Sequence, residues 1–265
     1  MISVISINNK FKSISPSEII NKLVNSRFAK GIEICADPRD DKMMKYMDEL
    51  VDLCKENNIL FQVHGDSSLP LDVQKEYIDR LSNYSDKLGY TINVVLHTLT
   101  RETVEESLHD SQEYFGELLD YRDKNKIRLS IENLNDAPGI VRLDKQEMLP
   151  LMKNDTRLYM TYDIGHDIAD YGNITDLDES LIKRISNVHL HQASSIYDRG
   201  YDHKPIDDES MYFEKVLKGI LYLLHIDYNG PVTYEYDLYL CDGDTIEDKI
   251  DNYIYSIDDT TEHFQ

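Results

Sequence analysis

The chain has few of the features that mark secreted or membrane-embedded proteins. Its three cysteines lie far apart and their odd number argues against a disulfide framework, so we expect free thiols. No apolar run reaches the roughly 18 residues that a membrane-spanning helix needs, which predicts no membrane partner. The opening residues, MISVISINNKFKS, lack the basic start and long apolar stretch of a secretory signal, which predicts a cytoplasmic protein.

Basic residues are also scarce. The chain has 28 Lys and Arg against 50 Asp and Glu, which gives a formal net charge of −22 at pH 7. No cluster of Lys and Arg is visible, and neither a GxGxxG nor a Walker motif occurs. Because such a surface repels a phosphate backbone, we expect no nucleic-acid partner. The same acidic balance suits a site that holds cations.

Short runs rich in β-branched and aromatic residues recur along the chain. They lie at 2–7, 31–36, 59–64, 91–97, 127–132, 157–163, 185–191 and 231–235. The spacing between successive runs fits one strand followed by one helix. Parallel neighbours need such crossover helices, and eight units most simply close into a barrel. The sequence therefore predicts an α/β fold, a single-domain (β/α)8 barrel over residues 1–265. A doubly wound open sheet is the alternative.

Helical patterns lie between these runs. Ser15 and Pro16 are typical of an N-cap and a first helical position, with Glu18 completing a capping-box pattern. Apolar residues at helical spacing predict further helices at 40–58, 72–88, 102–124, 176–184 and 209–225. The stretch 192–208 is a long polar loop, a kind of segment that is usually functional or disordered in a compact domain.

Metal-competent side chains stand at the ends of six consecutive predicted strands. These residues are His64, His97, Glu132, Asp163, His189 and Glu235. His166 follows Asp163 closely, and His203 lies in the long loop. Functional residues of barrels gather at the carboxyl ends of the strands, and carboxylates facing one another there would repel without a cation. The pattern therefore predicts a divalent-metal site at the barrel mouth.

The motifs VHGD, VVLHT, IENLN, TYDIGHD, NVHLHQ and TYEY occur in this order. Together they resemble the xylose isomerase-like TIM barrel superfamily, which includes sugar and sugar-phosphate isomerases and epimerases and the endonuclease IV type of apurinic endonuclease. The resemblance implies one divalent cation bound by Glu132, Asp163, His189 and Glu235. It also implies that Glu132 and Glu235 act as the acid–base pair. The cation could be Mn, Co, Zn, Fe or Mg, since mixed nitrogen and oxygen sites accept all of them.

A larger metal set is implied by the endonuclease relatives, which would add His64, His97, His166 and His203. Those relatives use an aspartate two residues before the loop histidine, where this chain has Tyr201; Asp198 or Asp202 could substitute. In the isomerase relatives, the residue that matches His166 contacts substrate instead.

Two further polar residues are candidates near the same site. His191 faces the same way as His189 on its strand, so it is a candidate for contact with a metal ligand or with the substrate. Glu33, at the end of the second strand, is a candidate substrate contact.

Two catalytic functions fit these residues. The first is a metal-dependent isomerase or epimerase that acts on a sugar, polyol or sugar phosphate by proton transfer through an enediolate. The alternative is a metal-dependent phosphodiester hydrolase. The extra histidines favour the hydrolase, whereas the negative charge and the missing aspartate favour the isomerase, with a carbohydrate as its small-molecule partner. A barrel that binds a small molecule without catalysis is the third possibility.

Overall fold

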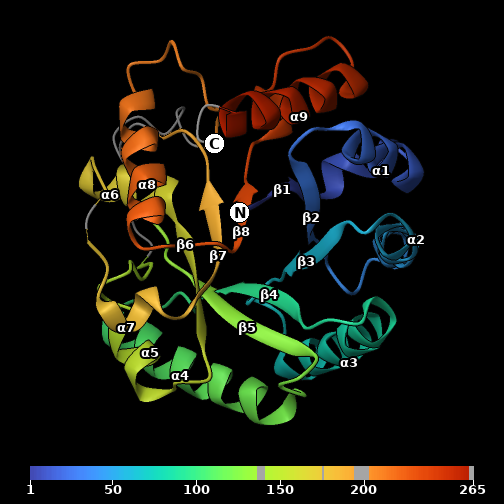
Figure 1. The fold of residues 1–265 in the computed structure, drawn as a ribbon. Helices are drawn as coiled ribbons and strands as arrows, with labels where there is room; N and C mark the ends of the chain where they lie inside the picture. Colours follow the sequence, from blue (N-terminus) through green and yellow to red (C-terminus); the bar gives the residue numbers. More distant parts are fainter. Residues whose placement is uncertain (136–140, 175, 194–202, 263–265) are drawn as a thin grey trace.

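Eight parallel strands form a closed barrel in sequence order (Figure 1). The computed structural model describes residues 1–135, 141–174, 176–193 and 203–262. The strands are β1 (Ile2–Ile7), β2 (Ala29–Cys35), β3 (Leu60–His64), β4 (Ile92–His97), β5 (Ile127–Glu132), β6 (Tyr159–Asp163), β7 (Ile185–Leu190) and β8 (Pro231–Tyr234). Every predicted strand is confirmed to within two residues at each end. The pairing of β8 with β1 closes the sheet, so the open-sheet alternative is wrong.

Helices surround the barrel, as Figure 1 shows. They are η1 (Asn9–Ser13), α1 (Pro16–Asn25), α2 (Asp41–Asn57), α3 (Leu71–Leu88), α4 (Val104–Tyr121), α5 (Leu149–Asn154), α6 (Ile164–Tyr171), α7 (Glu179–Ile182), α8 (Phe213–His225), η3 (Leu238–Leu240) and α9 (Ile246–Glu262). None of the described helices is long and apolar enough to cross a membrane.

Local capping explains where the predicted helices begin and end. Ser15 Oγ accepts a hydrogen bond from the Glu18 backbone N–H, so α1 begins at Pro16 as predicted. The 40–58 prediction is confirmed by α2, which ends where Asn58 adopts a left-handed conformation with φ of 56°. The segments 176–184 and 209–225 contain shorter helices than predicted, and α8 begins only at Phe213 because turns precede it.

Among the described residues, three α-helices were not predicted. Both α5 and α6 are too short to show an apolar period, and α6 begins directly after β6. The third, α9, buries Ile250, Tyr253 and Ile257 at helical spacing. Its Tyr253 hydroxyl accepts from the Ser6 backbone N–H (3.1 Å) and donates to the Tyr234 carbonyl, so α9 covers the seam where β8 meets β1.

A layer of neutral polar side chains crosses the barrel interior toward the amino ends of β4 to β7. It consists of Asn93, Ser130, Thr161 and Ser186, all buried, and we call it the lower polar layer. Asn93 donates to Ser130 Oγ (3.1 Å) and accepts from Ser186 Oγ (2.9 Å). The Ser130 and Thr161 hydroxyls lie 2.8 Å apart. These side chains therefore satisfy one another within the core.

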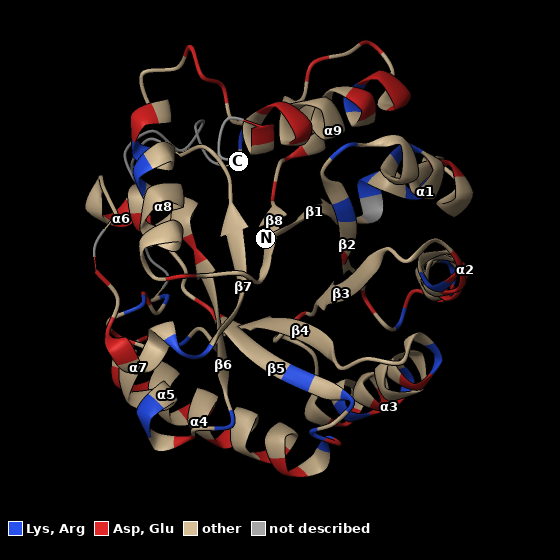
Figure 2. Cartoon of the chain, viewed as in Figure 1, with Lys and Arg blue, Asp and Glu red and all other residues tan. Residues whose placement is uncertain are grey.

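Acidic residues are spread over the outer helices and loops, whereas the strands are mostly uncharged (Figure 2). Lys and Arg are scattered among the acidic residues on the same helices and loops. The charged groups that the strands do carry toward their carboxyl ends therefore stand out from an otherwise neutral interior.

Candidate metal centre

Four of the predicted metal ligands meet at the carboxyl ends of β5 to β8. Glu132, Asp163, His189 and Glu235 each offer one ligand atom, and these atoms all lie within 4.8 Å of one another. We call these four residues the mouth cluster. The strand register brings these residues together. Asp163 of β6 is paired with His189 of β7, and Glu235, which follows β8, donates its backbone N–H to the Leu190 carbonyl.

His189 is the centre of the mouth cluster. Its Nδ1 lies 3.3 Å from Glu132 Oε1, 3.1 Å from Glu235 Oε2 and 3.9 Å from Asp163 Oδ2. The imidazole is fully buried, and Glu235 is the most accessible of the four side chains at 22% exposed. Three carboxylates thus surround one nitrogen in a site that excludes most water.

Several atoms of the mouth cluster lack hydrogen-bond partners among the described residues. They are Asp163 Oδ2, Glu235 Oε2 and both ring nitrogens of His189. Buried polar atoms are nearly always satisfied, since an unmade hydrogen bond in the interior is costly. A divalent cation between the carboxylate oxygens and His189 Nδ1 would satisfy Asp163 Oδ2, Glu235 Oε2 and Nδ1 and offset the repulsion, so the donor set fits a metal.

Asp163 is turned toward the cluster by its neighbours. Its Oδ1 caps α6 by accepting from the His166 backbone N–H (2.8 Å), which leaves Oδ2 directed at His189. Asn133, from the IENLN motif, accepts from the Asp163 N–H (2.8 Å) and donates to the Asp163 carbonyl (3.0 Å). The sequence analysis did not single out Asn133, although it directly follows Glu132.

Electrostatics favour a positive charge at this point. Burial alone would lower the pKa of His189, but Glu33, Glu132 and Glu235 together raise that pKa well above the usual value. Burial would raise the pKa of Glu132, yet His189 and His64 hold it well below its usual value. The compensating charge can be a proton on the imidazole or a cation at Nδ1.

A second group of ligands shares Glu132. His64 Nε2 lies 3.0 Å and His97 Nε2 3.3 Å from Glu132 Oε2, whereas Glu132 Oε1 faces His189. His64 is buried, and although burial opposes it, Glu132 raises the pKa of His64 to about 9. Glu132 therefore lies between His189 on one side, which its Oε1 faces, and His64 and His97 on the other, which its Oε2 faces.

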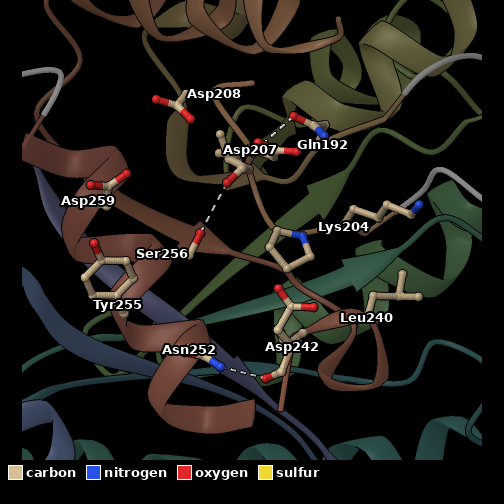
Figure 3. Close-up of a pocket in the computed structure, with 13 residues that line it drawn as sticks. Gln192, Lys204, Asp207, Asp208, Leu240, Asp242, Asn252, Tyr255, Ser256 and Asp259 are labelled. Atoms are coloured by element: carbon tan, nitrogen blue, oxygen red, sulfur yellow. Dashed lines mark hydrogen bonds between the residues drawn. The ribbon is translucent and has the colours of Figure 1, made fainter. Parts of the chain in front are cut away.

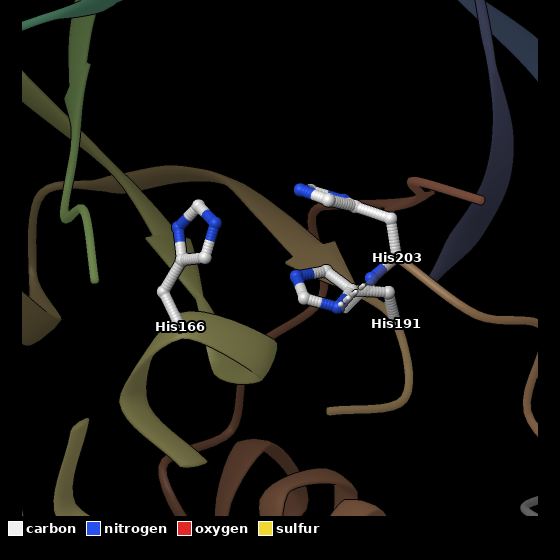
Figure 4. Close-up of side chains that lie close together, drawn as sticks. All are labelled: His166, His191 and His203. Carbon is white, nitrogen blue, oxygen red and sulfur yellow. Dashed lines mark hydrogen bonds between the residues drawn. The ribbon is translucent and has the colours of Figure 1, made fainter. Parts of the chain in front are cut away.

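A third group consists of His166, His191 and His203, whose ring nitrogens also lie within 4.8 Å of one another (Figure 4). The Nδ1 atoms of His166 and His203 lie 2.9 Å and 3.1 Å from the carbonyl oxygens of Asn133 and Glu235. A carbonyl only accepts, so each Nδ1 carries a proton, and in the neutral imidazole each Nε2 keeps its lone pair.

His191 belongs to this third group, although its sequence position did not decide between two possible contacts. Its Nδ1 accepts from the His203 backbone N–H (3.2 Å), and its Nε2 lies 3.2 Å from Asp163 Oδ1. It thereby connects the segment after β7 with the mouth cluster. The candidates Tyr201, Asp198 and Asp202 lie outside the described residues.

Glu33 lies deeper in the barrel than its place near the end of β2 suggests. It is fully buried beneath His189, with Oε1 at 3.0 Å from His189 Nε2, and it is not among the residues that line the mouth cavity. The role of Glu33 as a substrate contact therefore stays a prediction. The position of Glu33 near the strand end predicted that its side chain faces the barrel interior, but not how far below the mouth it lies.

A cavity of about 560 Å³ opens above the mouth cluster. Its lining includes Glu132, His166, His203 and Glu235 together with Arg142, whose Nη1 donates to Asn135 Oδ1 (3.2 Å). A cavity of this size holds a small molecule. Arg142 brings a cationic group into a mostly acidic mouth and was not singled out from the sequence.

A second cavity, of about 480 Å³, lies between α9 and residues 204–208 (Figure 3). Asp207, Asp208, Asp242 and Asp259 are among its lining residues. None of the residues described as lining this cavity also lines the mouth cavity. It is therefore separate from the mouth cluster.

The fold and the cluster define a (β/α)8 barrel with metal-competent residues at its mouth. The model of the xylose isomerase-like TIM barrel family matches residues 28–253, so the chain belongs to this family. No curated protein sequence matches the chain.

Similar solved structures share the fold over nearly the whole chain. D-psicose 3-epimerase with D-tagatose, from Clostridium cellulolyticum H10, is 14% identical with a TM-score of 0.69 over 100% of this chain and 98% of its own. A D-tagatose 3-epimerase-like protein is 20% identical (TM-score 0.65, 98% and 100% covered). A family 2 AP endonuclease from Brucella melitensis is 18% identical (TM-score 0.64, 93% and 95% covered).

Proposed function

We propose that this protein is a divalent-metal-dependent isomerase or epimerase acting on a sugar, polyol or sugar phosphate. The observation that carries the proposal is the placement of Glu132 and Glu235 beside one imidazole, with oxygens 3.3 and 3.1 Å from His189 Nδ1. Two carboxylates on either side of one cation position are what proton transfer between two faces of a substrate requires. The epimerases among the similar structures support the same reaction class.

Glu132, Asp163, His189 and Glu235 would hold the cation. Three carboxylates and one imidazole are hard to intermediate ligands, which suits Mn, Mg, Co, Fe or Zn. When bound, the cation would supply Lewis-acid polarisation of adjacent carbonyl and hydroxyl oxygens of the substrate.

The two glutamates would do the proton chemistry. Glu235, the more accessible, faces the cavity and would remove the proton beside the carbonyl group. Glu132, almost fully buried, would pass a proton taken up from water to the opposite face of the enediolate. His166 and His203 line the cavity and would orient substrate hydroxyl groups.

Arg142 supports an anionic substrate, a sugar phosphate in particular. Its guanidinium lines the mouth cavity, and in the described part of the chain its side-chain hydrogen bond goes to the neutral Asn135. Guanidinium groups bind phosphate through paired hydrogen bonds.

Deuterium exchange tests the proposed function directly. The purified protein, loaded with Mn²⁺, Co²⁺ or Zn²⁺, is incubated in D2O with D-fructose, D-psicose and D-tagatose and with their 6-phosphates. Deuterium at the carbon beside the carbonyl, with one metal per chain by elemental analysis, supports the proposal. Metal and sugar binding without exchange would instead indicate a barrel that only binds a small molecule.

A phosphodiester hydrolase is the second candidate, because His64 and His97 lie beside Glu132 Oε2 and His166, His191 and His203 form a further group. Such a site could hold more than one cation and activate a water between them. Cleavage of abasic duplex DNA, with three metals per chain, would favour this candidate. The net charge of −22 opposes it, so we expect no duplex binding at about 150 mM salt.

A further inference from the structure

Glu33 lies directly below the mouth cluster, in the fully buried interior of the barrel. It belongs to β2, where it is level with Gln62 of β3. A carboxylate at such a position is rare unless its oxygens are bound by donors or paired with a cation. The contacts of its two oxygens are therefore informative.

One oxygen, Oε2, is held by donors from two other strands and lies near a hydroxyl from a third. Gln62 Nε2 and Asn187 Nδ2 each donate to it at 2.9 Å, and Thr233 Oγ1 lies at 3.4 Å. Gln62 also donates to Thr233 Oγ1 (2.8 Å), which in turn donates to Asn187 Oδ1 (3.2 Å). This network fixes the orientation of the Glu33 carboxylate.

The other oxygen, Oε1, faces His189. It lies 3.0 Å from His189 Nε2 and has no hydrogen-bond partner elsewhere among the described residues. The opposite nitrogen of the same ring, Nδ1, faces Glu132, Asp163 and Glu235. The imidazole of His189 is thus located between a carboxylate below and three carboxylates above.

We propose that Glu33 is a positioning residue for His189. Its Oε1 keeps the proton of His189 on Nε2, so that the lone pair of Nδ1 points at the cation position. This inference rests on the metal site of the proposed function. Histidine ligands of metals generally need such a partner, because a neutral imidazole can otherwise carry its proton on either nitrogen. In this role Glu33 acts through His189.

The substitution Glu33→Gln tests this role with almost no change of shape. The donors from Gln62 and Asn187 require an acceptor at the Oε2 position, so the Gln carbonyl is expected there. The Gln amino group is then left against His189 Nε2, where it favours the tautomer with the proton on Nδ1. That proton would occupy the cation position. We expect Mn²⁺ and Zn²⁺ affinity to fall about 10- to 100-fold, the usual effect of losing such a partner.

Isothermal titration of the metal-free full-length chain measures the affinities, and thermal unfolding is recorded on the same samples. Ser186→Ala is the matched control, because it removes a buried hydrogen bond in the lower polar layer without contact with His189. A merely structural Glu33 predicts that both variants lose thermal stability and keep wild-type metal affinity. That result would overturn the inference.

A second measurement needs no variant and covers the case in which Glu33→Gln fails to fold. Nitrogen-15 NMR of the zinc-loaded wild-type protein identifies which ring nitrogen of His189 carries a proton. We expect a protonated Nε2 and a zinc-bound Nδ1. The reverse assignment would overturn the role of Glu33 while leaving the metal site intact. A wild-type protein that binds neither metal would overturn the metal site and this inference together.

Discussion

The barrel interior contains two polar layers that differ in how their hydrogen bonds are completed. In the lower polar layer, neutral side chains such as Asn93 and Ser186 satisfy one another. The mouth cluster lies farther toward the carboxyl ends of the strands. There charged groups converge, and atoms such as Asp163 Oδ2 and Glu235 Oε2 have no hydrogen-bond partner among the described residues. A satisfied layer stabilises the fold by itself, whereas the unsatisfied charged layer fits the cation that we propose for this site.

The largest effect should come from the mouth cluster through Glu235→Gln. The amide keeps the size and one acceptor oxygen but loses charge and basicity. We expect weaker metal binding that excess metal restores, and turnover lower by about 100-fold or more. Deuterium exchange into the substrate, with metal content measured on the same sample, checks this.

The matched control for this variant is Glu247→Gln, at an exposed position of α9, which should behave as wild type. Full exchange activity in metal-loaded Glu235→Gln would remove Glu235 from the mechanism. Glu235 would then resemble the side chains of the lower polar layer in having only a structural role.

The next effect should come from the mouth cavity through Arg142→Ala. Loss of a charged hydrogen bond costs about 1.5–3 kcal/mol, which raises the KM for a sugar phosphate by about 10- to 100-fold. The KM for the matching unphosphorylated sugar should not change. Steady-state kinetics on both substrates make the comparison, with Arg27→Ala, whose exposed partner is Glu262, as the control. Equal loss on both substrates would argue against a phosphate contact.

The pH dependence of stability should also separate the two layers. The pKa of His64 is raised to about 9. Its contribution to the free energy of unfolding is therefore complete below about pH 6.5 and is lost as the pH rises through 9. The pKa values of Glu132 and Glu235 are lowered, so their contributions are present above about 4.5 and are lost as the pH falls through the lower values.

The Tm of the chelator-treated protein should therefore fall between about pH 6.5 and 9, as His64 loses its proton. The increase of Tm on adding Mn²⁺ should instead grow with rising pH, since metal binding needs the deprotonated Nδ1 of His189. Thermal unfolding at several pH values, with EDTA or with Mn²⁺, measures both trends. A metal-dependent gain that is the same at all pH values would contradict the assignment of His189 as a ligand.

The smallest effect should come from Ser186→Ala in the lower polar layer. It removes a hydrogen bond to Asn93 (2.9 Å), so the free energy of unfolding should fall by about 1 kcal/mol. No titratable group belongs to this layer, so the loss should be the same at every pH. Denaturant unfolding at two pH values tests this, and a change in metal affinity would show that the layers are coupled.

Much of the site was predictable because the carboxyl ends of parallel strands share one end of a barrel. That rule alone brings His64, Glu132, Asp163 and His189 together. It does not find Arg142, whose position depends on the path of the segment after β5. Nor does it find α5 and α6, which are too short to show a helical period.

The depth of a side chain and the direction of each ring nitrogen depend on contacts between strands distant in the chain. Glu33 and His189 both face the barrel interior, and the periodicity of their strands predicts as much. The sequence pattern cannot tell that Glu33 lies under His189, because strand tilt and stagger set relative depth in a closed barrel. The order of strands and the chemistry at their ends are thus local properties of the chain. Which groups become neighbours, and which nitrogen of His189 faces the cation position, follow only from closing the barrel.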